Sequence, residues 1–283
     1  MTTVLVTGAT GNVGRPLVTL LANAGAKVRA VSRRPDDAGF PAGVDVVSSA
    51  TAGLGGADAV FLNSRALGDD VAAVVGQARD EGVTRLVSLS AIDADDDFSL
   101  QPSRLRGDRN KEVEQLAVDS GLPWVSLRPT MFVSNLAGMW STQLQAGDVV
   151  SGPYASSSMA PIVERDIAAV AARALLTDDL KGRKIDLTGP QAFTNAELVD
   201  VIGTVLGRPL HYREVQPEDV RQRFVGLGFP AAFADAYIAY QAVTVDTPAA
   251  VSHEVDTILG RPAESFAHWV ADHRALFTNQ QRG

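Results

Sequence analysis

The chain has 283 residues, of which 46% are hydrophobic, so it is long enough and apolar enough to bury a substantial core. The formal net charge is −8 and no stripe of Lys and Arg is present, which argues against nucleic acid as a direct partner. The chain contains no cysteine, and this excludes disulfides, thiolate nucleophiles and cysteine-ligated metals.

Short β-rich runs alternate with helical patterns along the first half of the chain. Strands are predicted over residues 2–7, 27–32, 44–48, 57–63, 85–90 and 123–128, and helices over 12–25, 69–82 and about 108–120. The strands are nearly continuous apolar runs, as expected when both faces of a parallel sheet are covered. The repeated β–α–β order predicts an α/β fold with a Rossmann-like, doubly wound parallel sheet.

The pattern changes after about residue 130. Residues 160–176 predict a short extended piece followed by a helix, and residues 182–189 predict one further strand. A helix start follows at Thr194, with Glu197 at the capping-box position. The remainder is mostly helical, without an internal repeat or a low-complexity linker.

Three glycines occupy the turn between the first strand and the first helix, in the stretch TGATGNVG. A dinucleotide site requires this order of strand, glycines and helix. Gly8 permits the tight turn, Gly11 lets the backbone approach a pyrophosphate, and Gly14 lets the helix lie close to the strand. We therefore predict a nucleotide site here; the alternative is a structural turn rich in glycine.

Three further residues of the same turn are candidate contacts. The free N–H groups of Asn12 and Val13 lie at the positive end of the helix dipole and are expected to face the phosphates. Thr10 precedes them in the turn and is included in the site.

The end of the second strand indicates which nucleotide is bound. An acidic residue there would bind the ribose 2′-hydroxyl of NAD, but the chain has Ser32, Arg33 and Arg34. Arginine can pair with a 2′-phosphate through charge-assisted hydrogen bonds, which favours NADP(H). The alternative is a solvated basic turn in which Asp36 or Asp37 neutralises the arginines.

On these grounds we divide the chain into two parts. Residues 1–153 are expected to form an NAD(P)-binding Rossmann domain, to which residues 160–189 return. Residues 190–283 are expected to form a smaller, mostly helical substrate lobe.

The glycine spacing, with Thr7 ahead of it, resembles the short-chain dehydrogenase/reductase superfamily, particularly its extended and atypical branches. A typical member carries a Tyr-x-x-x-Lys pair on the helix after the fifth strand, which supplies a proton to a carbonyl oxygen. Here no tyrosine lies between Ser90 and Gly121, and Arg106 and Asn110 take the places of the pair. Lys111 is adjacent, but nothing supplies the phenol. Ser90 either hydrogen-bonds the substrate or nicotinamide, or is a polar strand end.

This departure points to a narrower resemblance, carried by segments that span nearly the whole chain. They are VLVTGATGNVGRPLV, VRAVSRRP, DSGLPWVSLRPTMFVSN, APIVERDIAAVAARAL and LTGPQAFTNAELVDVIGTVLGRPL. Their order resembles the NmrA-like family of atypical short-chain dehydrogenase/reductases. That family includes NAD(P)H-sensing transcription regulators, NAD(P)H:quinone oxidoreductases and triphenylmethane dye reductases.

The resemblance implies further cofactor neighbours. Asn63 and Ser64 match the family's loop over the adenosine and the nicotinamide ribose, and Pro129 and Phe132 match the segment beside the nicotinamide. The chain departs from the family between the third and fourth strands, where the stretch SSATAGLGG is short and lacks the usual Gly-Asp.

Other polar and aromatic groups carry weaker hypotheses. Residues 93–97 (DADDD) follow the fifth strand and either attract a cationic substrate or form a solvated acidic loop. The four histidines do not have metal-ligand spacing, so no metal is expected. Trp140 and Met139, which follow the sixth strand, are expected to face the crevice in which an α/β sheet binds its ligands. Aromatic residues that either line a pocket or pack the lobe are Phe224, Phe229, Phe233, Tyr237 and Tyr240.

The chain opens directly into an apolar run without a basic segment before it, so a signal peptide is not expected. No stretch approaches the ~20 uninterrupted apolar residues of a membrane helix. We therefore expect a cytoplasmic protein with no membrane partner. The sequence does not determine the oligomeric state.

Two functions agree with these observations. The first is an NADPH-dependent reductase that passes hydride directly to an electrophilic small molecule, such as an aromatic, quinone-, dye- or enone-like compound, by positioning and desolvating the reactants without a strong general acid. The second is a non-catalytic protein that senses NADP(H) and regulates a partner. We favour the reductase because no dedicated protein-interaction element is evident.

Overall fold

The computed structural model describes residues 1–34 and 39–278. Its centre is a sheet of seven parallel strands in the order β3-β2-β1-β4-β5-β6-β9. The strands are β1 (Thr3–Val6), β2 (Lys27–Val31), β3 (Asp45–Val47), β4 (Ala59–Asn63), β5 (Arg85–Leu89), β6 (Trp124–Pro129) and β9 (Arg183–Leu187). The strand order reverses between β1 and β4, and in open α/β sheets ligands bind outside the carboxyl ends of the strands at such a point.

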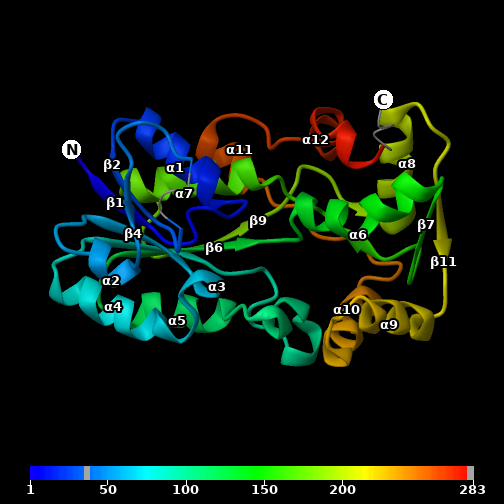
Figure 1. The fold of residues 1–283 in the computed structure, drawn as a ribbon, viewed down its shortest axis with the longest axis horizontal. Helices are drawn as coiled ribbons and strands as arrows, with labels where there is room; N and C mark the ends of the chain where they lie inside the picture. The colour runs from blue at the N-terminus through cyan, green and yellow to red at the C-terminus, as the bar shows by residue number, and fades with distance from the viewer. Residues whose placement is uncertain (35–38, 279–283) are drawn as a thin grey trace.

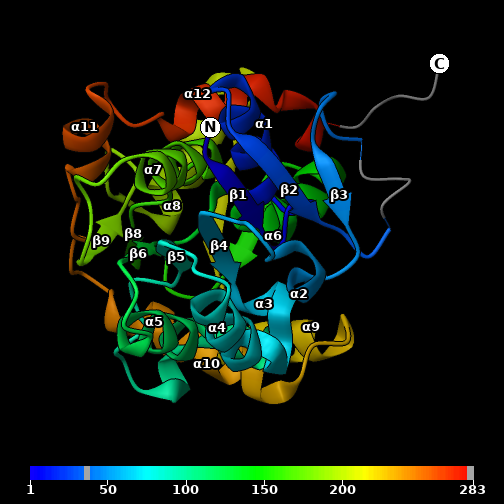
Figure 2. The ribbon, with the colours of Figure 1, turned by 90° about the vertical axis from the view of Figure 1, so that its left-hand side faces the viewer.

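Helices cover both faces of the sheet (Figures 1 and 2). One face packs against α1 (Gly14–Asn23), α7 (Glu164–Leu176) and α11 (Glu254–Leu259). The other packs against α2 (Ala50–Gly53), α4 (Val71–Asp80) and α5 (Asn110–Asp119). The short segments α3 (Ser64–Leu67), η1 (Gly68–Asp70), η2 (Phe98–Leu100) and η3 (Pro102–Arg106) follow β4 and β5. This arrangement confirms the predicted doubly wound fold.

A second apolar core lies at the other end of the molecule (Figure 1). It is built from α6 (Val133–Ala146), β7 (Val149–Gly152), α8 (Asn195–Leu206), β11 (His211–Glu214) and α12 (Phe266–Asp272). The strands β8 (Ser158–Met159) and β10 (Phe193–Thr194) pair with each other, and β7 pairs with β11. The last described segment is η4 (Arg274–Leu276). The capping box predicted for α8 is present, because Thr194 and Glu197 exchange both hydrogen bonds.

This second core changes the interpretation of two segments. Trp140 is 4% exposed and packs edge-on against Tyr212 at a ring distance of 6.3 Å, so the expectation that it faces the crevice is wrong. The sequence could not show this because its partner lies on β11, 72 residues further on. Since α6 and β7 share the core of α8 and α12, we propose that residues 133–152 belong to the lobe.

The predicted aromatic set packs mainly against itself. The ring of Phe224 on α9 (Pro217–Gly226) lies 5.3 Å from that of Phe233 and 5.2 Å from that of Tyr237, both on α10 (Ala231–Val243). Phe229 stacks on Phe233 at a ring distance of 4.8 Å. These four rings therefore hold α9 and α10 together.

In the described part of the chain, no helix has both the length and the apolar character needed to cross a membrane.

A buried charge network ties α5 to the sheet. Glu114 on α5 is 2% exposed and accepts hydrogen bonds from Arg128 on β6 (2.5 and 2.8 Å), Lys184 on β9 (2.6 Å) and Ser126 (2.5 Å). Burial by itself would raise the pKa of Glu114, but the hydrogen bonds from Arg128, Lys184 and Ser126 outweigh it and lower the pKa to about 2. The carboxylate therefore stays ionised and binds two cations, Arg128 on β6 and Lys184 on β9, so that it links α5 to both strands.

Replacing Glu114 with Gln keeps the shape of the side chain and removes the charge. We expect a loss of about 3 kcal/mol in the free energy of unfolding at pH 7, because Arg128 and Lys184 lose their buried partner. The pKa is lowered on folding from the ordinary 4.5 to about 2, so this contribution is complete above pH 4.5 and disappears as the pH falls towards 2. Urea unfolding between pH 7 and pH 3 measures it. The exposed Glu81→Gln variant is the control, and equal stabilities of the two variants would contradict the prediction.

Candidate functional site

The glycine turn lies at the carboxyl end of β1, where the strand order reverses. Thr7 is fully buried there; its hydroxyl donates to the Phe61 carbonyl at 2.8 Å and accepts from the Asn63 N–H at 2.8 Å. Gly8 has φ of +64°, and a Cβ at that position would lie 2.9 Å from the Asn63 amide nitrogen. The ends of β1 and β4 are therefore locked together, and Gly8 is required both for its backbone and for the space it leaves to Asn63.

The other two glycines of the turn meet different surroundings. A Cβ at Gly14 would overlap the Gly8 carbonyl oxygen and lie 2.7 Å from the Ala9 Cα, so only glycine lets α1 lie this close to the turn. A Cβ at Gly11 would meet the Gly8 oxygen at 3.2 Å and no other atom within 4 Å. The space in front of Gly11 is therefore open, as a site for a pyrophosphate requires.

The start of α1 offers unused donors. Among the backbone hydrogen bonds described for this turn, Gly11 N–H donates to Gly8 and Arg15 N–H to Gly11, whereas none has the N–H of Asn12 or Val13 as donor. The α1 helix begins at Gly14 and has no side-chain cap, so these N–H groups stand at the positive end of its dipole. Thr10 is exposed in the same turn. The turn thus has the donors and the open space that an anionic group needs.

The Asn12 side chain is engaged elsewhere. Its amide donates to the Ser134 hydroxyl at 2.9 Å, and the Ser134 N–H donates to the Glu164 carboxylate at 3.2 Å. These bonds join the glycine turn to the first turns of α6 and α7. They therefore connect α6, which belongs to the second core, to the glycine turn and to α7 on the face of the sheet.

The turn after β2 presents its two arginines outward. The Ser32 hydroxyl is buried; it accepts from the Arg34 N–H at 3.1 Å and donates to the Arg34 carbonyl at 3.0 Å, which fixes the turn. Both guanidinium groups are exposed and have no hydrogen bond or ion pair to another described side chain. The suggested alternative partners, Asp36 and Asp37, lie outside the described residues.

Ser64 and Ser90 both hold the start of α5. The Ser64 hydroxyl, 2% exposed, accepts from the Arg109 N–H at 3.0 Å, and the Ser90 hydroxyl, 3% exposed, donates to the Asn110 carbonyl at 3.1 Å. Both therefore position α5 against the ends of β4 and β5. Contact of either hydroxyl with a cofactor stays a prediction.

The residues at the end of β6 border the same edge of the sheet. Pro129 is the last residue of β6, and its carbonyl accepts from the Ile92 N–H at 3.1 Å. Phe132 is the residue before α6 and pairs with Ile162 through an isolated bridge. Phe132 is partly buried against the core of the sheet and precedes the helix that leads into the second core. Both residues thus lie where the sheet meets the lobe.

The residues in the place of the Tyr–Lys pair do not meet. Arg106 ends η3 and lies 5.8 Å from the ring of Phe229, Asn110 donates to the Ser103 hydroxyl at 3.4 Å, and Lys111 lies 3.7 Å from Asp95. None of these three therefore stands in for a phenol beside a cation.

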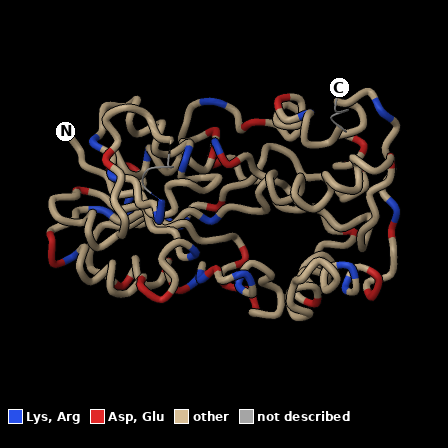
Figure 3. Tube along the Cα trace, in the orientation of Figure 1, with Lys and Arg blue, Asp and Glu red and all other residues tan. Residues whose placement is uncertain are grey.

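The acidic segment after β5 divides into different environments, within a stretch that carries closely spaced charges of both signs (Figure 3). Asp95 pairs with Arg128 at 2.7 Å, and Asp97 accepts from the Ser99 N–H at 2.8 Å. Hydrogen bonds from these partners lower the pKa of both carboxyl groups. Asp93 differs: burial, with the nearby carboxylates of Asp96 and Asp108, raises its pKa to about 6 against a hydrogen bond from its own backbone N–H.

From the sequence, residues 93–97 form one acidic segment and Asp93 is not separated from its neighbours, because the five letters DADDD suggest one environment. Asp93 is partly buried, and Tyr240 of α10, 147 residues further along the chain, lies close enough to interact with it, which is a tertiary effect. The signal that was available is its position three residues after Ser90, at the carboxyl end of a central strand.

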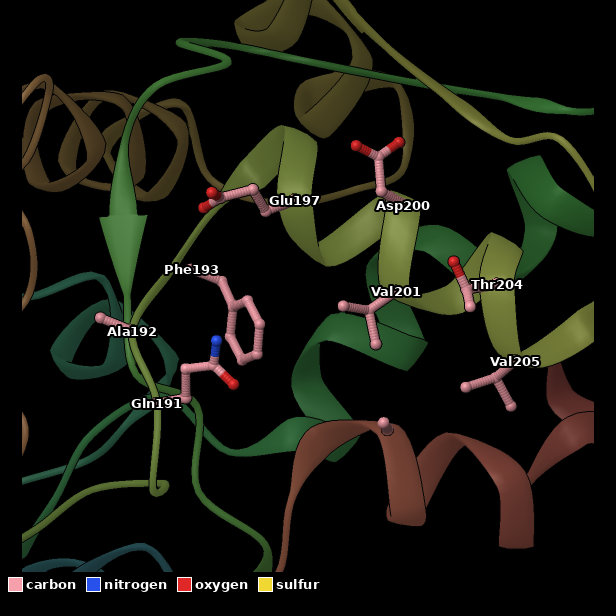
Figure 4. Close-up of a pocket in the computed structure, with 9 residues that line it drawn as sticks. Gln191, Ala192, Phe193, Glu197, Asp200, Val201, Thr204 and Val205 are labelled. Carbon is pink, nitrogen blue, oxygen red and sulfur yellow. The ribbon is translucent and has the colours of Figure 1, made fainter.

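One hollow on the lobe lies apart from these residues. It has a volume of about 360 Å³ between α8 and α12, with Phe193, Val201 and Val205 on its apolar side and Glu197 and Asp200 on α8 at its rim (Figure 4). None of its lining residues comes from the carboxyl edge of the sheet.

One group in the described chain has the composition of a metal site. Ligand atoms of Glu264, His268 and Asp272 lie within 4.8 Å of one another, whereas the spacing of the histidines predicts no metal site. Glu264 lies 3.7 Å from Arg165, and His268 and Asp272 are exposed. We assign no metal to this group.

Comparisons with known proteins identify the family and relatives of this chain. Residues 8–178 match a family described as NAD(P)H-binding. The chain is 36% identical to the (4-alkanoyl-5-oxo-2,5-dihydrofuran-3-yl)methyl phosphate reductase of Streptomyces griseus and 31% identical to the NAD(P)H azoreductase of Xenophilus azovorans. Both alignments cover 97% of this chain and 99% of the relative.

Solved structures share the fold. The NADPH complex of the quinone oxidoreductase QOR2 from Escherichia coli superposes with a TM-score of 0.82 at 22% identity, over 96% of this chain and 99% of that one. The NADP(H) complex of the triphenylmethane reductase from Citrobacter sp. superposes with a TM-score of 0.77 at 18% identity, over 96% and 100%.

The open space at Gly11 gives a direct test of the turn. Gly11→Val should abolish NADPH binding in a protein that remains folded, because the new side chain points into the space that a pyrophosphate would need. Isothermal titration calorimetry measures the binding, and far-ultraviolet circular dichroism measures the folding. Gly76→Val on α4, where a Cβ also meets nothing within 4 Å, is the control and should bind normally. Unchanged binding in Gly11→Val would remove the assigned role.

Proposed function

This chain belongs to the NAD(P)H-binding, NmrA-like family of atypical short-chain reductases, and from that premise we propose that it reduces electrophilic small molecules with NADPH. The observation that carries the proposal is the match, over nearly the full length of both chains, to two relatives that are each named as reductases. The glycine turn, with its open space and unused N–H groups, supports the same conclusion.

The names of the relatives suggest a class of acceptor. A 5-oxo-2,5-dihydrofuran ring contains a C=C bond conjugated with a carbonyl group, an azo dye contains an N=N bond, and a quinone is a conjugated dicarbonyl. In each, hydride adds to an electron-poor double bond and the negative charge spreads over neighbouring atoms. We therefore infer a quinone-, dye- or enone-like substrate for this chain.

The residues of the turn fit a bound dinucleotide. Gly8, Gly11 and Gly14 shape the space, and the N–H groups of Asn12 and Val13 would hold the pyrophosphate. When bound, the reduced nicotinamide supplies the hydride.

The protein's other contributions are position and exclusion of water. Ser64 and Ser90 fix α5 against the ends of β4 and β5, while Pro129 and Phe132 border the junction of sheet and lobe. A reactant held in that position gains effective concentration and loses its water shell.

The experiment that tests the function is NADPH consumption against a panel of quinones, azo and triphenylmethane dyes and enones. We expect clear turnover with at least one of these classes. Tight NADPH binding without turnover on any of them would overturn the reductase and favour an NADP(H)-sensing protein.

The choice of nucleotide is a separate prediction. We expect NADPH to bind more tightly than NADH, and Arg33→Ala to lose most of the difference, because one charge-assisted pair with the 2′-phosphate is worth roughly 1.5–3 kcal/mol. Titrations with both nucleotides measure this. The control is Arg79→Ala on α4, an exposed arginine near Asp80. Equal affinities for the two nucleotides in the parent protein would refute the prediction.

A further inference from the structure

Asp93 lies on a turn at the carboxyl edge of the sheet. Beyond the end of β5, Ser90 N–H donates to the Leu127 carbonyl at 2.8 Å and Ile92 N–H to the Pro129 carbonyl at 3.1 Å, so the chain runs alongside β6 as far as its last residue. Asp93 follows immediately, and Asp96 N–H closes the turn by donating to the Asp93 carbonyl at 3.0 Å. The turn that carries Asp93 therefore lies next to the edge at which the reactants are expected.

Two anchors hold this turn in place. Gln101, 3% exposed, donates from its amide to the Asp96 carbonyl at 2.8 Å. On the other side Arg128, itself bound to the buried Glu114, donates to the Asp95 carboxylate at 2.7 Å. The turn is thus fixed to the sheet by Arg128 and to the following segment by Gln101. A group carried on it is preorganised.

Elements from both halves of the molecule surround Asp93. The carboxylate of Asp108, which is paired with Arg65 after the end of β4, acts on Asp93 from one side. From the lobe, α10 packs on η2 and η3 and brings Tyr240 close enough for the carboxylates of Asp93 and Asp96 to act on its phenol. Burial, with these carboxylates, raises the pKa of Tyr240 to about 12.

The Asp93 carboxyl group itself has no ion pair or side-chain hydrogen bond within the described chain. The carboxylates of Asp96 and Asp108 disfavour a negative charge on Asp93. In contrast, Asp95 is paired with Arg128, and Asp97 accepts hydrogen bonds from Ser99. Asp93 therefore holds its proton more readily than an exposed aspartate does, as a general acid must.

We propose that the protonated Asp93 carboxyl group is the proton donor of the reduction, placed between the loop after β4 and Tyr240 on α10. This inference rests on the proposed reductase function. It replaces the expectation that no side chain serves as an acid.

The step balances with one hydride and one proton. The acceptor takes two electrons and one hydrogen as hydride from the reduced nicotinamide, which is oxidised to NADP⁺. The acceptor atom that gains the negative charge forms a bond to the proton as the O–H bond of Asp93 breaks. The carboxylate then recovers a proton from water before the next turnover.

The pH profile with the best acceptor from the panel tests this role. With the parent protein, kcat/KM should fall above about pH 6, because the acid form of Asp93 is lost there. Asp93→Asn should lower kcat/KM by about 10²–10⁴-fold and lose that dependence, with NADPH binding unchanged. Asp93→Glu, which keeps an acid, should retain a fall with pH. Asp97→Asn, in the same segment but with a lowered pKa, is the control and should behave as the parent.

A measurement without cofactor or turnover separates the electrostatics from the chemistry. Carboxyl ¹³C NMR titration of aspartate-labelled protein should show one resonance with a midpoint near pH 6 that disappears in Asp93→Asn. A midpoint for Asp93 near its ordinary value would overturn the proposal. So would an unchanged profile in a folded Asp93→Asn, while the reductase function would stand. Absence of turnover in the parent protein would overturn both. If Asp93→Asn does not fold, a pH-independent Asp93→Glu would overturn the proton donor.

Discussion

The reversal of strand order between β1 and β4 is the constraint on which the rest of the structure depends. Adjacent parallel strands normally close the space between their carboxyl ends with their connections, and only where the connections diverge does a crevice remain. Thr7 holds the two strands together at that point through two hydrogen bonds from one buried hydroxyl. Gly14 then allows α1 to start directly against the turn. The glycine turn and the start of α1 are thus packed closely at the point where the strand order reverses.

Polar contacts hold the start of α5 against the ends of β4 and β5. Three interactions locate this helix: Ser64 accepts from its preceding N–H, Ser90 donates to its first carbonyl, and Glu114 binds Arg128 and Lys184. The same Arg128 extends to Asp95 and so fixes the turn after β5. Consequently the charge pair between α5 and β6 also contacts the turn that carries Asp93. Stability and site geometry are coupled through one guanidinium group.

The lobe changes the chemistry of this edge by covering it. Packing of α10 on η2 and η3 brings Tyr240 near Asp93, and Arg106 at the end of η3 lies over the ring of Phe229, just before α10. The carboxyl group of Asp93 is thereby made a weaker acid than it is in water, because the charged form loses its hydration. Superfamily members that carry a Tyr–Lys pair place the acid on the helix after the fifth strand. In this chain that helix has no tyrosine, and the acid we propose comes from the turn before it.

The sequence by itself determined the parts of the protein that depend on neighbours in the chain. Local backbone and periodicity rules predict the strand–glycine–helix turn, the alternation of strands and helices and the capping box at Thr194. The structure contains each of these features. Only the tertiary structure decided which polar side chains are buried and against what. Trp140 was misplaced, and Asp93 was not distinguished from the rest of the acidic segment, because the residues near them include ones on β11 and α10, more than 70 residues away. Burial, and with it the charge state of a carboxyl group, is a property of the packed chain and has no local signature.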